Sequence, residues 1–254
     1  CRMRDFPIEN STWAELEKEI KDFLPDVLVI SIGSPTIDLD LKACDIAKKI
    51  NHDVITIAKG AHLAVFDKEI LTKYHNLDIV IRNEVEFTAL DLATKEQLEN
   101  IEGITFRTGK EIIRNPERDP VNDLDKLPFP ARHLLKNELY IRPDTKEPLT
   151  VIMTGRGCPY RCIFCLAGKL SNYRLLQRSY KRVVDEIEEC VNKHGIKNFF
   201  FLADTFTFNR EWVINFCKEV ISRNLKIEWG TNSRVDTLDE ERVKWMKKAG
   251  CYVI

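Results

Sequence analysis

Hydrophobic residues in the first part of the chain alternate between short continuous runs and segments with helical spacing. The continuous runs cover residues 27–30, 54–58 and 78–81. Such runs are typical of parallel strands that are buried on both faces. The segments with apolar residues three or four positions apart cover residues 13–23, 39–50 and 67–74. Strands that alternate with helices predict an open, doubly wound parallel sheet of the Rossmann-like α/β class, with ligands at the carboxyl ends of its strands.

The same alternation resumes from residue 148. Strands are predicted at 150–153, 198–202 and 226–229, and helices at 179–194, 210–223 and 239–249. Ser179 and Asp239 stand at the N-cap positions of two of these helices. A further strand begins at Cys251, where the chain ends. Repeated strand–helix units predict the N-terminal part of a (β/α) barrel, whose complete form needs ~200 residues or more.

The intervening segment has a different pattern. Residues 103–114 read as a hairpin that turns at Thr108 and Gly109, and three prolines between 120 and 130 disfavour regular structure. We therefore predict three parts: a Rossmann-like domain over 1–97 whose first strand is missing, a hairpin and Pro-rich connector over 98–147, and the start of a barrel over 148–254. Because the chain opens on Cys1 and stops inside a predicted strand, we expect a fragment that lacks both ends.

Charge and hydropathy exclude several classes of protein. The 254 residues include 39 basic and 40 acidic side chains, a formal net charge of −1. With this balance, no global electrostatic field points to nucleic acid or to an anionic membrane as a partner. No uncharged apolar run approaches the ~18 residues of a membrane span, and no secretory signal pattern opens the chain. We expect a soluble, cytoplasmic protein.

Three of the eight cysteines are clustered: Cys158, Cys162 and Cys165. Clustered cysteines in a reducing compartment are more often metal ligands than disulfides. Structural zinc sites usually have four ligands, and no second Cys or His pair with such spacing follows. Three cysteines on a [4Fe–4S] cluster leave one iron open for another ligand. The spacing favours the cluster, with zinc and unligated thiols as alternatives. Other cysteines fall within predicted helices and are interpreted as small buried hydrophobic residues: Cys44, Cys190 and Cys217.

Residues 158–165, CPYRCIFC, resemble the C-x3-C-x2-C signature of the radical S-adenosylmethionine (SAM) superfamily. The resemblance implies a [4Fe–4S] cluster on the three cysteines, whose open iron binds the amino and carboxylate groups of SAM. One electron, from a reductant such as flavodoxin or ferredoxin, then gives methionine and a 5′-deoxyadenosyl radical. Phe164 occupies the aromatic position that lies near the adenine in this superfamily.

Two later segments resemble the cobalamin-associated branch of the superfamily. Residues 203–207, ADTFT, are similar to its Asp-Asp-x-Phe-Thr motif, with alanine in place of the first acid. Asp204 is therefore a candidate ligand for the SAM amino group; the alternative is a cap for the helix that begins near Arg210. Asn232 and Arg234 follow the third barrel strand and are candidate SAM ligands, with an ordinary polar loop as the alternative. No catalytic residue is identified.

The front domain resembles the cobalamin-binding (B12) domain that precedes many radical SAM barrels. Candidate cobalamin contacts at the expected sheet edge are Ser31, Ser34, Thr36, Gly60, His62 and Glu84. Small residues there would let a backbone approach a flat corrin. The usual Gly-Gly pair is Lys59-Gly60 here, and no Asp-x-His-x-x-Gly cobalt-ligating motif occurs. For His62 the alternative is a turn or capping residue.

The chain as a whole resembles B12-binding-domain radical SAM proteins, including the branch like anaerobic magnesium-protoporphyrin monomethyl ester cyclase. The expected activity is reductive cleavage of SAM, with cobalamin, for methyl transfer or oxidative cyclisation of an unidentified small molecule. One alternative is a cobalamin-independent enzyme such as a methylthiotransferase, which predicts a second cluster motif in the front domain; none is present. Another is an iron–sulfur or zinc binding module without turnover. The isolated fragment is expected to be inactive.

Overall fold

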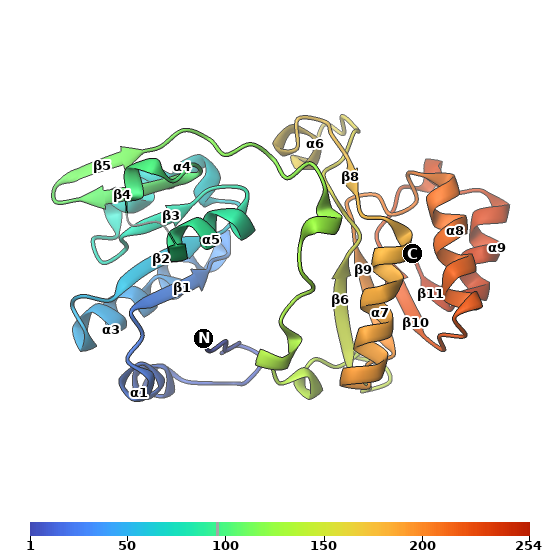
Figure 1. The fold of residues 1–254 in the computed structure, drawn as a ribbon, viewed down its shortest axis with the longest axis horizontal. Coiled ribbons are helices and arrows are strands. Elements are labelled where there is room, and N and C mark those ends of the chain that lie inside the picture. Colours follow the sequence, from blue (N-terminus) through green and yellow to red (C-terminus); the bar gives the residue numbers. More distant parts are fainter. Residues whose placement is uncertain (95–96) are drawn as a thin grey trace. The chain divides into compact units, whose positions relative to one another are not determined.

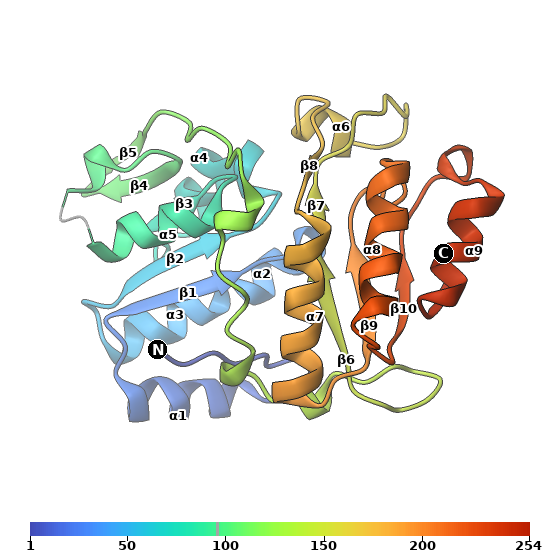
Figure 2. The same ribbon diagram turned by 45° about the vertical axis from the view of Figure 1, so that its right-hand side comes forward.

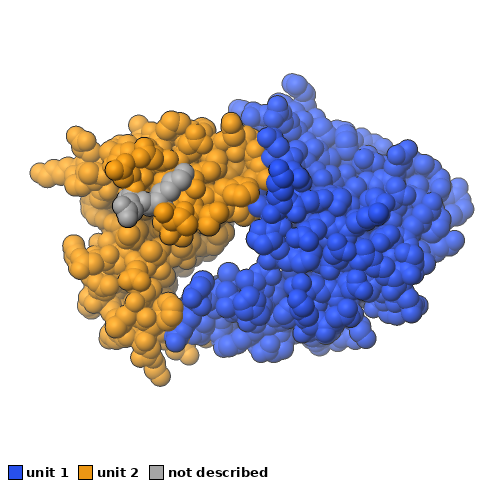
Figure 3. Space-filling model, in the orientation of Figure 1, with its two compact units in different colours: residues 1–9, 122–254 blue, residues 10–121 orange. Residues whose placement is uncertain are grey.

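The computed structural model describes residues 1–94 and 97–254, apart from the side chain of Leu170. These residues divide into two compact units. One consists of Cys1–Glu9 and Asn122–Ile254, and the other of Asn10–Val121. Figure 3 distinguishes the two units by colour.

The unit of residues 10–121 is built on one five-stranded sheet (Figure 1). Its strands, in spatial order, are β1 (Val27–Ser31), β2 (Ile55–Lys59), β3 (Ile79–Ile81), β4 (Ile104–Thr108) and β5 (Glu111–Arg114). The first three strands are parallel, as predicted, and β4 and β5 continue the sheet as an antiparallel hairpin. The hairpin was predicted within the connector. It belongs to the front sheet because Ile104 and Phe106 are completely buried beside β3.

Helices cover both faces of this sheet. They are α1 (Trp13–Phe23), α2 (Ile37–Asp40), α3 (Lys42–Ile50), α4 (Leu63–Lys73) and α5 (Val85–Thr94). Cys44 of α3 and Leu71 of α4 share one core with Val80. The opposite core contains Ile79, against which side chains of α5 pack. The predicted two-sided α/β layering is therefore present.

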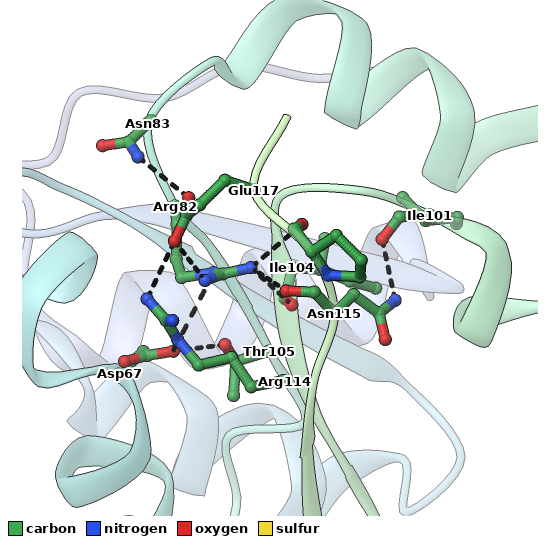
Figure 4. Close-up of polar contacts among 10 residues, drawn as sticks. Asp67, Arg82, Asn83, Ile101, Ile104, Thr105, Arg114, Asn115 and Glu117 are labelled. Carbon is green, nitrogen blue, oxygen red and sulfur yellow. Dashed lines mark hydrogen bonds and ion pairs between the residues drawn. The ribbon is translucent and has the colours of Figure 1, made fainter. Parts of the chain in front are cut away.

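A buried polar network joins the end of β3 to the hairpin (Figure 4). Arg82 follows β3 and is completely buried; its guanidinium donates to Glu117 Oε1 at 2.6 Å and to the carbonyl oxygen of Asn115 at 2.5 Å. Asp67 of α4 accepts a hydrogen bond from Arg114 Nε at 2.8 Å. Charge-assisted hydrogen bonds of this kind are about twice as strong as neutral ones. The network therefore fixes the backbone from which Glu84 projects.

The second unit contains a parallel four-stranded sheet whose spatial order follows the chain; Figure 1 labels all four strands, and Figure 2 labels the first three from another side. Its strands are β6 (Leu149–Met153), β9 (Asn198–Leu202), β10 (Glu228–Thr231) and β11 (Cys251–Val253). One face is covered by α7 (Tyr180–His194), α8 (Arg210–Ser222) and α9 (Glu240–Lys248). Sequential parallel strands with helices on one face are the arrangement in which a (β/α) barrel begins. The predicted strands and helices are confirmed, with β10 displaced by two residues.

The helix-covered face of this sheet is aromatic. Phe201 lies 5.0 Å from the Trp229 ring and 5.2 Å from the Phe216 ring, measured between ring centroids. The predicted N-caps are also confirmed, because the side chains of Ser179 and Asp239 each accept a backbone hydrogen bond from their helix. Helix positions are therefore set both by packing and by their first turns.

The remaining elements of this unit are short. They are β7 (Gly155–Arg156), β8 (Leu176–Gln177), α6 (Ala167–Leu170) and 3₁₀ turns at Leu124–Lys126, Arg132–Leu134, Asn137–Leu139 and Val235–Thr237. After the hairpin, the Pro-rich connector thus forms turns and one isolated bridge between Ile141 and Pro148, without a regular helix or strand in its described residues, as its prolines predicted. In the front unit, 3₁₀ turns lie at Ser34–Thr36 and Leu98–Asn100. None of the described helices is both long and apolar enough to cross a membrane.

Cysteine burial leads to a first prediction. Cys44, Cys190, Cys217 and Cys251 are buried. Burial raises the pKa of the Cys44 thiol to about 12 and that of Cys190 to about 11, and only the thiolate reacts. Treating the metal-free native protein with iodoacetamide at pH 8 should therefore modify the exposed Cys1 and Cys165 and spare Cys44, Cys190, Cys217 and Cys251.

Peptide mass spectrometry measures this selectivity, and the same reaction in denaturant, where all eight thiols are accessible, is the control. Modification of Cys190 in the native protein as fast as Cys165 would contradict the burial described here.

Candidate functional site

The three clustered cysteines lie on the loop that leaves the first strand of the second sheet. β6 ends at Met153, and β7 leads directly into this cysteine loop, residues 157–166. Gly157 has φ +84°, and a Cβ atom there would lie 2.2 Å from the carbonyl oxygen of Arg174. Glycine is therefore required immediately before Cys158. The loop begins at the carboxyl edge of the sheet, where α/β barrels have their active sites.

The three thiols differ in exposure. Cys158 is buried at the base of the loop, with Sγ 3.8 Å from the Thr205 hydroxyl oxygen. Cys162 is half-buried, and Cys165 is exposed. Among the residues described, no group of three or more His, Cys, Asp or Glu side chains is arranged to hold a metal ion. The structure thus places the three thiols on one loop without drawing them into a formed metal site.

The donor set nevertheless fits an iron–sulfur cluster. Three thiols within eight residues match the number of protein ligands that leaves one iron of a [4Fe–4S] cluster open. A structural zinc site needs a fourth ligand. Ile163 and Phe164, at the tip between Cys162 and Cys165, are exposed, so packing does not prevent the tip from adjusting to a ligand.

Arg234 links the loop after β10 to the cysteine loop. Its Nη1 donates to Cys162 Sγ at 2.9 Å. Its Nε and Nη2 donate to the two carboxylate oxygens of Asp236 at 2.9 and 2.6 Å. The guanidinium also lies over the Tyr160 ring, 3.9 Å from its centroid. The pKa of Arg234 is raised above its usual value, mainly because the guanidinium donates hydrogen bonds to the Asp236 carboxylate. Arg234 therefore contacts the cysteine loop as a fixed cation, and its predicted contact with SAM stays a prediction.

Sequence reasoning missed three residues of this site: Thr205 beside Cys158, Asp236 beside Arg234, and Tyr160 of the cysteine loop itself. Thr205 is buried beside Cys158, and its position within the ADTFT motif could have suggested a contact. Asp236 stands two residues after Arg234, a spacing that permits the observed two-pronged ion pair.

The other predicted SAM residues lie at the same sheet edge. Asp204 follows β9, Asn232 follows β10, and both are exposed. The alternative of Asp204 as a helix cap is wrong: the cap of α8 is Asn209, whose Oδ1 accepts from the Trp212 backbone N–H at 3.0 Å. Because β6, β9 and β10 are adjacent and parallel, the loops that carry Asp204, Asn232 and the cysteines leave the sheet in the same direction.

The predicted cobalamin residues of the front unit lie at the carboxyl edge of its parallel strands. Ser31, Lys59 and Ile81 form one register row at the ends of β1, β2 and β3. Lys59 Nζ donates to Ser31 Oγ at 3.2 Å. A Cβ atom on Gly60 would lie 2.6 Å from the carbonyl oxygen of Ile32. Glycine is therefore required at position 60 by the close approach of two strand ends.

Two further segments complete this edge. Thr36 donates to Asp40 Oδ2 at 2.7 Å, and the same oxygen accepts from the Gly33 N–H at 3.0 Å. Asp40, which sequence reasoning missed, thereby closes the turn that exposes Ser34. Glu84 is half-buried, and its carbonyl oxygen accepts from Thr88 at 2.6 Å.

His62 precedes α4 at its N-cap position, but its side chain makes no capping hydrogen bond. Its ring instead stacks on Phe66, with 4.8 Å between the ring centroids. Phe66 and the neighbouring Val65 are exposed. The two stacked rings therefore lie at the start of α4, close in sequence to Gly60, and His62 does not cap the helix.

A comparison with protein-family models finds a match in the second unit. Residues 152–254 match the family model described as the radical SAM superfamily. The chain contains a radical SAM domain. The resemblance carried by the cysteine motif is thereby confirmed. The matched residues begin in β6 and include the cysteine loop, Asp204, Asn232 and Arg234.

Curated relatives match most of the chain. An uncharacterized methyltransferase of Pyrococcus horikoshii is 30% identical over 97% of this chain and 54% of its own length. The anaerobic magnesium-protoporphyrin IX monomethyl ester cyclase of Rubrivivax gelatinosus is 32% identical over 93% of this chain and 44% of its own length. The chain thus spans about half the length of the curated relatives it matches.

A solved structure supports the same fold. The radical SAM methyltransferase TsrM of Kitasatospora setae, with cobalamin and a [4Fe–4S] cluster bound, superimposes with a TM-score of 0.76. The match covers 98% of this chain and 51% of TsrM at 17% sequence identity. The match covers residues of both units, so the likeness in fold is not confined to the second unit.

Proposed function

We propose that the protein is a radical SAM enzyme that cleaves SAM reductively and uses cobalamin for methyl transfer or oxidative cyclisation of a small molecule. The observation that carries the proposal is the three-cysteine loop at the carboxyl edge of a parallel sheet, within a matched radical SAM domain. Relatives named as methyltransferases and as cyclases support both reaction types.

Cys158, Cys162 and Cys165 would hold the cluster, which supplies the electron that cleaves the carbon–sulfur bond of SAM. The electron would come from a one-electron reductant such as flavodoxin or ferredoxin. The carboxylate of Asp204 suits the SAM amino group, and the exposed Phe164 ring suits the adenine face. Asn232 offers a donor and an acceptor at the same edge.

The substrate would meet the sheet face that the helices leave open. Val151 of β6 and Leu202 of β9 are exposed there. They lie on the face opposite Ile152 and Phe201, which are buried under the helices. An apolar lining of this kind excludes water from a reactive radical.

Cobalamin would lie at the carboxyl edge of the front sheet. Small and polar residues are exposed there, including Ser31, Ser34 and Thr36. The half-buried His62 ring stacked on the exposed Phe66 offers an aromatic surface for a planar ring. A methylthiotransferase-like enzyme is less well supported, because residues 10–121 contain a single cysteine, the buried Cys44.

Reconstitution tests the proposal directly. The full-length protein that contains this chain would be purified without oxygen and incubated with iron, sulfide and hydroxocobalamin, and then reduced with dithionite in the presence of SAM. We expect about four irons per chain, bound corrin in the absorption spectrum, and 5′-deoxyadenosine by mass spectrometry.

Bound zinc with no SAM cleavage would overturn the radical mechanism. SAM cleavage without bound corrin would support the radical SAM activity but contradict the proposed use of cobalamin.

A further inference from the structure

The contacts of Arg234 point to an interaction with a cluster-ligand cysteine rather than with SAM. One guanidinium is shared by three partners: the Cys162 sulfur, the Asp236 carboxylate and the Tyr160 ring. Two of these partners, Tyr160 and Cys162, belong to the cysteine loop. Arg234 is 72 residues from Cys162 in sequence, so the contact ties the loop after β10 to the loop after β6.

The geometry leaves the guanidinium little freedom. Asp236 occupies Nε and Nη2 in a two-pronged pair at 2.9 and 2.6 Å, which fixes the plane of the group. Stacking on Tyr160 at 3.9 Å fixes the side on which it lies. Nη1, the remaining nitrogen, is thereby directed at Cys162 Sγ. Because its nitrogens are directed at these partners, Arg234 is poorly placed to bind the SAM carboxylate.

We propose that Arg234 is a positioning residue for the cluster: it hydrogen-bonds the sulfur of Cys162 and thereby raises the reduction potential of the cluster. The inference rests on the proposed function, since it requires a cluster on the three cysteines. Hydrogen bonds to ligand sulfurs are among the factors that set iron–sulfur potentials. A donor stabilises the more negative, reduced cluster, so its removal makes reduction harder.

An EPR-monitored redox titration without SAM tests this. In Arg234→Gln the ratio of reduced to oxidised cluster at a fixed potential should fall about tenfold, which is about 59 mV for a one-electron couple. Tyr160→Leu, which removes the stacking surface, should shift the ratio in the same direction by less. Tyr160→Phe, which keeps the ring, should leave it unchanged.

The matched control is Arg210→Gln. Arg210 is an exposed arginine of the same unit that pairs with Asp239 and Glu241, and its removal should not move the potential. If Arg234→Gln retains no cluster, Tyr160→Leu decides: an unchanged ratio there overturns the proposal. An unchanged potential in Arg234→Gln with weaker SAM binding overturns it in favour of a SAM contact. Failure of the unsubstituted protein to bind a cluster would instead refute the proposed function, before any variant is compared.

Discussion

Cys165→Ala in the full-length protein is expected to reduce 5′-deoxyadenosine formation by about 1,000-fold or more, because the proposed open-iron cluster would then keep only two protein ligands. Changes to groups that merely support metal ligands already cost 10–100-fold, so loss of a ligand should cost more. Cys165 is the best of the three cysteines for this test because its side chain is exposed. Its removal leaves no cavity, so folding should be unaffected. Cys158, by contrast, is buried beside Thr205.

The control is Cys1→Ala. Cys1 is also exposed and lies in the same unit, but outside the cysteine loop. Iron content and 5′-deoxyadenosine should match those of the unsubstituted protein. Circular dichroism of Cys165→Ala should show an unchanged fold, and its iron content should fall. Full activity with four irons in Cys165→Ala would show that this cysteine is not a ligand.

Most elements of the fold could be predicted from hydrophobic spacing, and the exceptions have physical causes. Helix α5 was not predicted because its apolar residues do not form one stripe: Phe87 and Leu90 are exposed, whereas Val85 and Leu92 pack on the core. The hairpin was predicted correctly as a hairpin. Its membership of the front sheet depends on antiparallel pairing with β3, which no local pattern encodes.

The candidate site was predictable where its chemistry is local in sequence. The spacing of Cys158, Cys162 and Cys165 identified the loop, and the strand before it indicated the sheet edge. The contact of Arg234 with Cys162 was not predictable, because it depends on which loops the adjacent parallel strands bring together. The cap of α8 could not be predicted either, although the residues involved are close in sequence. Asp204 and Asn209 both precede that helix, and only the backbone geometry selects Asn209 as its cap.

Glu186→Gln should lower the free energy of unfolding of the second unit by about 3–5 kcal/mol, the usual cost of breaking a buried ion pair. Glu186 of α7 is 1% exposed. Its Oε1 accepts from Arg132 of the connector and its Oε2 from Arg178, each at 2.6 Å. Neutralising Glu186 removes the carboxylate that the two buried guanidinium groups share. Arg178 also donates to the carbonyl oxygen of Met153 at 2.9 Å. Loss of the ion pair should therefore also destabilise the end of β6, from which the chain leads into the cysteine loop.

Urea unfolding followed by tryptophan fluorescence measures this effect, since three of the four tryptophans lie in the second unit. Glu189→Gln is the matched control on the same helix. Glu189 pairs with Lys193 across one helical turn at 3.1 Å, and both side chains are partly exposed, so its loss should cost only about 0.3–0.5 kcal/mol. A cost below about 1 kcal/mol for Glu186→Gln would mean that water reaches the two arginines. The connector would then be held to α7 by packing rather than by charge.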